Sequence, residues 1–212
     1  MIKLRISVFN EVLEQGKDFL APHGDHAIWI KSGTIKVGEE SFQESCGTYV
    51  GSESLIACSV AEPTQIIRFT VTTDDGKEPL QPRGNLLLSN TFSIENVNSI
   101  LRLDRVTFPE NAVAYRHIHP GAGIRYLTRG MLQIIADDHS KQIKPNEAWF
   151  EDANSPVKAI AAPAGISEFI RVMVLPAEYL GKPTIKRLNE EDMDKPTLQT
   201  NHRYFDEGIT LR

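Results

Sequence analysis

The sequence predicts an all-β protein built from two similar barrels in one chain. Its apolar segments are short, rich in β-branched and aromatic residues, and separated by turn-forming residues, as in sandwiches and barrels. A weak internal repeat relates the first half of the chain to the second. With 212 residues, of which 41% are hydrophobic and 24% charged, the chain is long enough to bury a core in each half.

The expected strands run along most of the chain. Turn-rich pieces at 73–77, 109–111, 137–140 and 144–146 separate several of them. In the tail, Asn189 is placed to cap a single acidic helical turn within 188–193. The strands are expected at residues 27–30, 34–37, 54–60, 65–72, 85–88, 99–108, 112–118, 124–128, 131–136, 148–151, 157–161 and 168–175.

Matching segments occur in the same order in both halves, which indicates a duplication. The segment WIKSG at 29–33 aligns with YLTRG at 126–130, Tyr49 then falls opposite Trp149, and residues 67–68 fall opposite 170–171. These matches divide the chain into an N-terminal half (1–84), a C-terminal half (85–176) and an extended tail (177–212), with a linker at 74–84. We expect the tail to act as a structural clasp across one half rather than as a functional lid.

The composition argues against several classes of partner. A net charge of −5 gives no broad basic surface for nucleic acid, and there is no cationic amphipathic run for a membrane. No apolar run approaches the roughly 18 residues of a membrane span, and no signal peptide is apparent. We therefore expect a cytoplasmic protein, with Cys46 and Cys58 as reduced, buried thiols. Nucleotide-binding, acyl-transfer and zincin motifs do not occur.

The segment AYRHIHP at 114–120 carries the main chemical signal. His117 and His119 are two residues apart, so on a strand both imidazoles point to one face. Two imidazoles on one face are the beginning of a site for Zn, Fe, Cu or Ni. The alternative is that they are ordinary polar residues near a strand end.

These segments resemble the cupin superfamily, and the duplication resembles a bicupin. Residues 103–109 leading into His117, His119 and then Gly130 are similar to cupin motif one, G-x5-H-x-H-x3,4-E-x6-G. Residues 145–151 followed by 154–157 are similar to motif two, P-x-G followed by a histidine. The resemblance implies two double-stranded β-helix (jelly-roll) barrels and chemistry on a small molecule, of the dioxygenase or isomerase kind.

The metal ligands implied by the resemblance are incomplete in this chain. Metal-binding members use three histidines and one glutamate, but Gly123 stands at the glutamate position and Val157 at the third histidine position. The opening glycine of motif one is also absent. A divalent Fe, Mn, Ni or Zn ion would therefore be held by His117 and His119, with waters or Glu151 completing the shell.

Strand periodicity suggests which other side chains share this interior. If residue 123 faces inward, so does Arg125, and by the same rule Tyr115 lies with the two histidines. Trp149 and Glu151 share one face of the motif-two strand. Glu151 is then either the counter-ion of Arg125 or a metal ligand, and a free Arg125 would favour a carboxylate or phosphate.

Three functions are compatible with these features, and the sequence leaves open whether the chain is an enzyme. In the first, it is a metal-dependent enzyme with Arg125 and Glu151 as catalytic residues and Tyr115, Arg125 and Trp149 lining the substrate pocket. In the second, it binds a small organic acid without metal, as a sensor or carrier. A structural role, with the tail engaging a partner, is a third possibility.

The rest of the chain is assigned no part in the chemistry. The N-terminal half is expected to be a structural partner, which makes a monomer as reasonable as a homodimer. His23 and His26 are expected in a surface or partly buried loop, and His139 and His202 in solvent.

Overall fold

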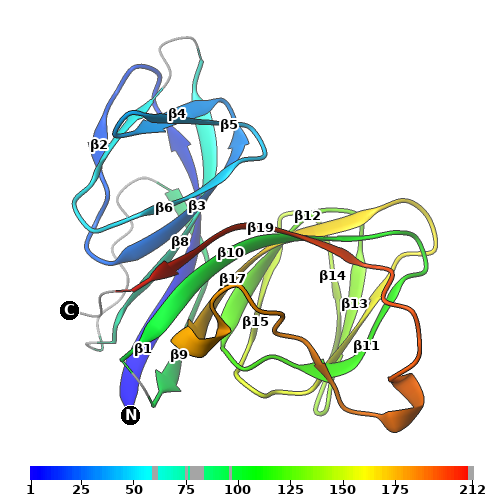
Figure 1. Ribbon diagram of the computed structural model, residues 1–212. Helices are drawn as coiled ribbons and strands as arrows, with labels where there is room; N and C mark the ends of the chain where they lie inside the picture. The colour runs from blue at the N-terminus through cyan, green and yellow to red at the C-terminus, as the bar shows by residue number, and fades with distance from the viewer. Residues whose placement is uncertain (59–61, 75, 77–83, 96, 210–212) are drawn as a thin grey trace.

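A computed structural model of the chain describes residues 1–58, 62–74, 76, 84–95 and 97–209. Most of the expected linker at 74–84 and the end of the expected strand 54–60 lie outside the described residues. Two β-barrels, each made of two antiparallel sheets, lie side by side (Figure 1). The prediction of an all-β chain with two barrels is confirmed.

The N-terminal barrel pairs a five-stranded sheet with a four-stranded one. The larger sheet consists, in spatial order, of β6 (Gly47–Val50), β3 (Asp25–Ser32), β8 (Thr64–Thr73), β1 (Ile2–Leu13) and β9 (Gly84–Ile94). The smaller sheet consists of β2 (Phe19–Leu20), β7 (Leu55–Cys58), β4 (Thr34–Val37) and β5 (Glu40–Gln43).

The C-terminal barrel has two five-stranded sheets. The first consists of β15 (Ala148–Glu151), β12 (Gly123–Arg129), β17 (Ser167–Pro176), β10 (Ser99–Phe108) and β19 (Thr200–Gly208). The second consists of β14 (Ser140–Ile143), β13 (Leu132–Ala136), β16 (Val157–Ala161), β11 (Val113–Ile118) and β18 (Lys186–Arg187).

The sheet order explains the internal repeat. In the N-terminal barrel β3 lies between β6 and β8, and in the C-terminal barrel β12 lies between β15 and β17. Gly33 and Gly130 follow these central strands with φ of +83° and +75°. A Cβ at Gly33 would lie 2.6 Å from Thr64 Oγ1, and one at Gly130 2.5 Å from Ile166 O, so both turns require glycine. The aligned segments therefore occupy equivalent strands.

The larger sheet of the N-terminal barrel packs on the first sheet of the C-terminal barrel. A single apolar cluster joins them, with Trp29 and Phe69 from one side and Tyr126 and Ile170 from the other. Separate apolar clusters fill the interior of each barrel. Each barrel thus covers the sheet face that the other would leave exposed to water.

Strand β1 was not among the expected strands, although it lies inside its sheet and pairs with both β8 and β9. Strand β9 belongs to the same sheet, so hydrogen bonding of the N-terminal barrel continues past the expected boundary at residue 84 to Ile94. The side chains of Leu4, Ile6 and Val8 are buried in the inter-barrel cluster.

The tail forms part of the C-terminal barrel. It passes from a 3-10 turn, η1 (Ala177–Tyr179), through β18, which pairs with β11, and η2 (Glu190–Asp192), and returns as β19 along β10. The expected acidic turn is η2. Asn189 precedes it as expected, but its Nδ2 donates to Asp192 at 3.1 Å instead of capping the backbone.

His26 differs from the expectation of a surface or partly buried loop residue. It lies in β3 with no exposed surface. Its Nδ1 lies 2.9 Å from Thr70 Oγ1 and its Nε2 2.9 Å from the Pro22 carbonyl oxygen. The alternating pattern places it on the inner face of a paired strand, where both ring nitrogens find partners. Cys58 is buried as expected, whereas Cys46 is half-buried.

Candidate functional site

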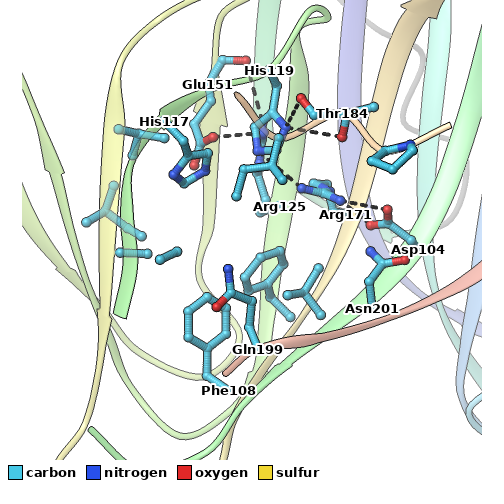
Figure 2. Close-up of a pocket in the computed structure, with 18 of the residues that line it drawn as sticks. Asp104, Phe108, His117, His119, Arg125, Glu151, Arg171, Thr184, Gln199 and Asn201 are labelled. Carbon is cyan, nitrogen blue, oxygen red and sulfur yellow. Dashed lines mark hydrogen bonds and ion pairs between the residues drawn. The ribbon is translucent and has the colours of Figure 1, made fainter. Parts of the chain in front are cut away.

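A cavity of about 270 Å³ lies inside the C-terminal barrel (Figure 2). One end is polar, and the rest of the wall is apolar except where Arg102, Thr197, Gln199, Asn201 and Arg203 line it. The polar end carries His117, His119, Arg125, Glu151, Arg171, Asp104 and Thr184. The apolar wall is formed by Val106, Phe108, Ala114, Ile134, Trp149, Val157, Ala159 and Phe169.

His117 and His119 lie together at the polar end, as the sequence predicts. Their ring centroids are 4.9 Å apart and the rings are nearly perpendicular. His117 Nδ1 lies 2.6 Å from the Tyr115 carbonyl oxygen, and His119 Nδ1 lies 3.2 Å from the Thr184 carbonyl oxygen. Because a carbonyl oxygen can only accept, each Nδ1 carries the proton and each Nε2 carries the lone pair.

Both imidazoles are neutral at physiological pH. Burial lowers the pKa of His117, and it lowers the pKa of His119 well below the usual 6.5. The guanidinium groups of Arg171 and Arg125 lower the pKa of His119 further, because a second positive charge would be repelled. The pair therefore offers lone pairs rather than positive charge.

Arg125 and Glu151 form an ion pair inside the barrel. Arg125 Nη2 lies 2.8 Å from Glu151 Oε2, without the alignment of a hydrogen bond. Arg125 Nη1 donates to the Gly123 carbonyl oxygen at 2.8 Å, and Trp149 Nε1 donates to Glu151 Oε1 at 2.8 Å. Burial lowers the pKa of Arg125 to about 10, with Glu151 opposing the shift, so the guanidinium stays charged. Of the two roles considered for Glu151, the geometry is that of the counter-ion.

A second ion pair was not anticipated from the sequence. Arg171 donates to both carboxylate oxygens of Asp104, at 2.9 Å through Nε and 2.7 Å through Nη2. Its Nη1 lies 3.3 Å from His119 Nε2. The sequence of β10 did indicate that charged side chains enter the barrel, because Arg102 and Asp104 lie on the same strand face as Val106. All three line the cavity.

Tyr115 lies away from the cavity, contrary to its expected place beside the histidines. The register between β11 and β16 shifts between Ala114 and His117, and this bulge breaks the alternation on which the expectation depended. Ala114 and His117 line the cavity, but Tyr115 does not. Its ring instead faces the cations of Arg187 and Lys195, at 5.4 and 4.9 Å from the ring centroid.

The donors at the polar end do not fit a divalent metal in this arrangement. The lone pair of His119 is directed at a guanidinium, and both nearby carboxylates are ion-paired. A side chain at Gly123, the expected glutamate position, is excluded because its Cβ would lie 2.0 Å from the Val172 carbonyl oxygen. Across the part of the chain that the structure describes, no three His, Cys, Asp or Glu side chains form a group that could hold a metal.

Neither a protein-family model nor a curated protein matches this chain by sequence. Solved structures resemble it. A mutant oxalate decarboxylase from Bacillus subtilis has a TM-score of 0.60 at 11% identity, covering 91% of this chain and 73% of that one. AerE from Microcystis aeruginosa has a TM-score of 0.54 at 11% identity, covering 82% and 88%. The protein Ylba from E. coli has a TM-score of 0.52 at 15% identity, covering 81% and 77%.

These likenesses concern the fold, because the identities are too low to carry an activity. The fold, a β-barrel duplicated in a single chain, is the one that the resemblance of the two sequence motifs implies. None of the described helices is long and apolar enough to cross a membrane.

Proposed function

We propose that the C-terminal barrel binds a small organic acid without a metal, with the acid group at the polar end of the cavity and an apolar body against the wall. The observation that carries this proposal is the charge of the lining. Four arginines line the cavity, and three carboxylates pair with them, which leaves one positive charge in excess. The pairs are Arg125 with Glu151, Arg171 with Asp104, and both Arg102 and Arg203 with Asp206.

Arg171 is the group best placed to receive the acid. Its Nη1 donates to a neutral imidazole at 3.3 Å, and a carboxylate oxygen is a stronger acceptor than an imidazole nitrogen. Asp104 accepts hydrogen bonds from the other two guanidinium nitrogens, Nε and Nη2, so the plane of the guanidinium is fixed before a ligand arrives. The lone pair on His117 Nε2 would accept a hydrogen bond from a donor group of the ligand.

The remaining wall restricts the ligand to a small, partly apolar molecule. Phe108, Trp149 and Phe169 are in aromatic contact, with ring centroids 6.0 Å apart for Phe108 and Phe169 and 5.3 Å apart for Trp149 and Phe169. A cavity of about 270 Å³ is slightly smaller than the usual range for small-molecule sites. A planar or short-chain carboxylic acid matches both size and polarity.

A metal-dependent enzyme, of the dioxygenase or isomerase kind, is the second candidate. It is favoured by the two neutral imidazoles at the polar end of one cavity. It requires Arg171 to turn away from His119 so that the Nε2 lone pair becomes available to a metal. In that function Arg125 and Glu151 would be the catalytic residues.

Calorimetric titration with small carboxylic acids tests the proposal. Arg171→Gln combined with Asp104→Asn removes the receiving guanidinium without leaving a buried unpaired charge. We expect the affinity for an acid to fall by on the order of tenfold or more, as for loss of a hydrogen bond to a charged group. Arg116→Gln is the matched control, because Arg116 pairs with Asp137 at the surface. If wild type binds no small acid, or if the double variant binds as wild type does, the proposal fails.

A further inference from the structure

Strand register orders the side chains of the first sheet from the polar end of the cavity inward. Arg171 pairs with Asp104 across β17 and β10. Two residues along the same face, Phe169 pairs with Val106, and Phe108 follows two residues further on. Because alternate residues of a strand share a face, Phe169 and Val106 lie next to the polar row, and Phe108 lies beyond them (Figure 2).

The second sheet has short side chains at the corresponding depth. His117 pairs with Val157, and the preceding pair on β11 and β16 is Ala114 with Ala159. Both alanines line the cavity and belong with Phe169 to the apolar cluster inside this barrel. The inner faces of two packed sheets oppose each other, and an alanine side chain is a single methyl group. The alanine pair therefore leaves open the space that larger side chains would fill opposite Phe169.

The side chains on both sides of this space have surface that a ligand can reach. Phe169 is 7% exposed and Ala159 6% exposed, and both line the cavity. Leu127 pairs with Phe169 on the neighbouring strand β12, but it has no exposed surface and does not line the cavity. The residual exposure of Phe169 and Ala159 is thus surface that faces the cavity.

Phe169 is the shared member of two aromatic pairs. The interplanar angle is 37° with Phe108 and 74° with Trp149. Aromatic rings in such tilted and edge-on contacts attract each other beyond the burial of their apolar surface. An aromatic ligand lying over the alanines would add a further contact of this kind, whereas a saturated ring would contribute apolar burial alone.

We propose that the space between Phe169 and the alanine pair Ala114 and Ala159, here called the aromatic slot, selects flat aromatic acids over saturated acids of similar size. Ala159 is the residue that sets the width of the slot. The selection rests on the proposed function, since the position of the carboxylate at Arg171 is taken from it. With the carboxylate there, the body of the ligand enters the next row inward, which is the aromatic slot.

The experiment compares two acids that have the same number of carbon atoms and are both ionised at neutral pH. Benzoate has a flat ring, and cyclohexanecarboxylate has a puckered, thicker one. The full chain is titrated with each by calorimetry, and with pentanoate as a flexible acid. In wild type we expect benzoate to bind about tenfold more tightly than cyclohexanecarboxylate, because only benzoate fits the slot without strain and gains the aromatic contact.

One variant tests each side of the slot. Phe169→Leu keeps an apolar side chain but removes the ring, so the preference for benzoate should fall to about twofold or less. Ala159→Val adds two methyl groups, so the affinity for benzoate should fall on the order of tenfold. Without ligand, Ala159→Val should be as stable to urea as wild type, because it fills empty space; a closely packed alanine would lose stability. Ala57→Val, on β7 of the N-terminal barrel and outside the cavity, is the matched control and should bind both acids as wild type does.

The outcomes separate the aromatic slot from the proposed function. If benzoate and cyclohexanecarboxylate bind wild type equally, or if pentanoate binds and benzoate does not, the slot does not select aromatic acids and acid binding stands. The same holds if Phe169→Leu keeps the full preference or Ala159→Val binds benzoate as wild type does. If none of the three acids binds to wild type, the proposed function fails and the aromatic slot falls with it.

Discussion

Arg171 Nη1 lies 3.3 Å from His119 Nε2, so the lone pair through which this histidine would bind a metal is directed at a guanidinium. Asp104 holds that guanidinium in place through two hydrogen bonds. The retained His-x-His motif therefore stands beside a fixed positive charge. The contact between Arg171 and His119 distinguishes this chain from metal-binding proteins of the same fold more directly than the missing third histidine does.

The first prediction concerns metal. Protein purified without a histidine tag or chelator is expected to contain transition metal well below one equivalent, because two imidazoles beside two guanidiniums attract a cation weakly. Releasing His119 with Arg171→Gln and Asp104→Asn should raise Zn²⁺ affinity on the order of tenfold, as measured by competition with a chelating dye. Adding His117→Ala to that variant should abolish the gain. One equivalent of metal in wild type, lost in His117→Ala/His119→Ala, would instead support the metal-dependent enzyme.

The second prediction concerns Gly123. An alanine there would place its Cβ 2.0 Å from the Val172 carbonyl oxygen, in the backbone of the neighbouring strand β17. Since backbone cannot move aside as a flexible side chain can, we expect Gly123→Ala to lower the free energy of unfolding by about 3 kcal/mol or more. Urea denaturation measures this. Gly208→Ala, with open space around its Cβ, should change stability by less than about 1 kcal/mol, and equal losses in the two variants would contradict the clash.

The third prediction concerns Arg187, which holds the tail in place. Its Nη1 donates to the carbonyl oxygens of Met193 and Lys195 at 3.0 and 2.6 Å, and its Nη2 donates to Thr197 Oγ1 at 2.7 Å. In Arg187→Met we expect amide hydrogen exchange in residues 190–199 to accelerate on the order of tenfold, with the strands of the N-terminal barrel unchanged.

The control for the tail prediction is Arg116→Met. Arg116 lies on β11 with His117, and its substitution removes a surface ion pair with Asp137. It should leave exchange in 190–199 at its wild-type rate. If exchange in Arg187→Met also stays at the wild-type rate, other contacts hold the tail and the assigned role of Arg187 is wrong.

Much of the fold could be predicted from the sequence, because its signals are local. The repeat WIKSG and YLTRG ends at glycines that the backbone requires, and short strands separated by turns are typical of barrels. The missed strand β1 also carried a local signal: Ile2, Leu4, Ile6 and Val8 alternate with more polar residues over its first half. Strand β19 had no comparable alternating pattern. Its formation depends on pairing with β10, which is distant in sequence.

The candidate site was predictable where strand alternation holds. His117, Arg125, Trp149 and Glu151 line one cavity as expected from periodicity. Tyr115 was misplaced because a bulge in β11 inserts an extra residue, and a bulge has no reliable mark in a single sequence. The roles of the tail residues could not be derived, because which barrel the tail covers is decided by long-range packing.

The last prediction concerns pH and His26. Burial lowers the pKa of this histidine from 6.5 to about 4, despite the hydrogen bond to the Pro22 carbonyl oxygen, and the nearby cation of Arg68 lowers it further. A histidine with a lowered pKa binds its proton more readily in the unfolded chain. Its contribution to stability is therefore complete above pH 6.5, is lost as the pH falls from 6.5 to about 4, and does not change further below that.

A shift of this size corresponds to a loss of about 3 kcal/mol over that interval. His117 and His119 act in the same direction, because burial lowers their pKa values too, so the comparison must be made with a variant. His26→Gln should be less stable than wild type at pH 7, because it disturbs two buried hydrogen bonds, but its stability should fall less steeply between pH 6.5 and 4. Urea denaturation across this range measures both slopes, with exposed His139→Gln expected to follow wild type. Parallel slopes for wild type and His26→Gln would show that His26 does not titrate with a lowered pKa.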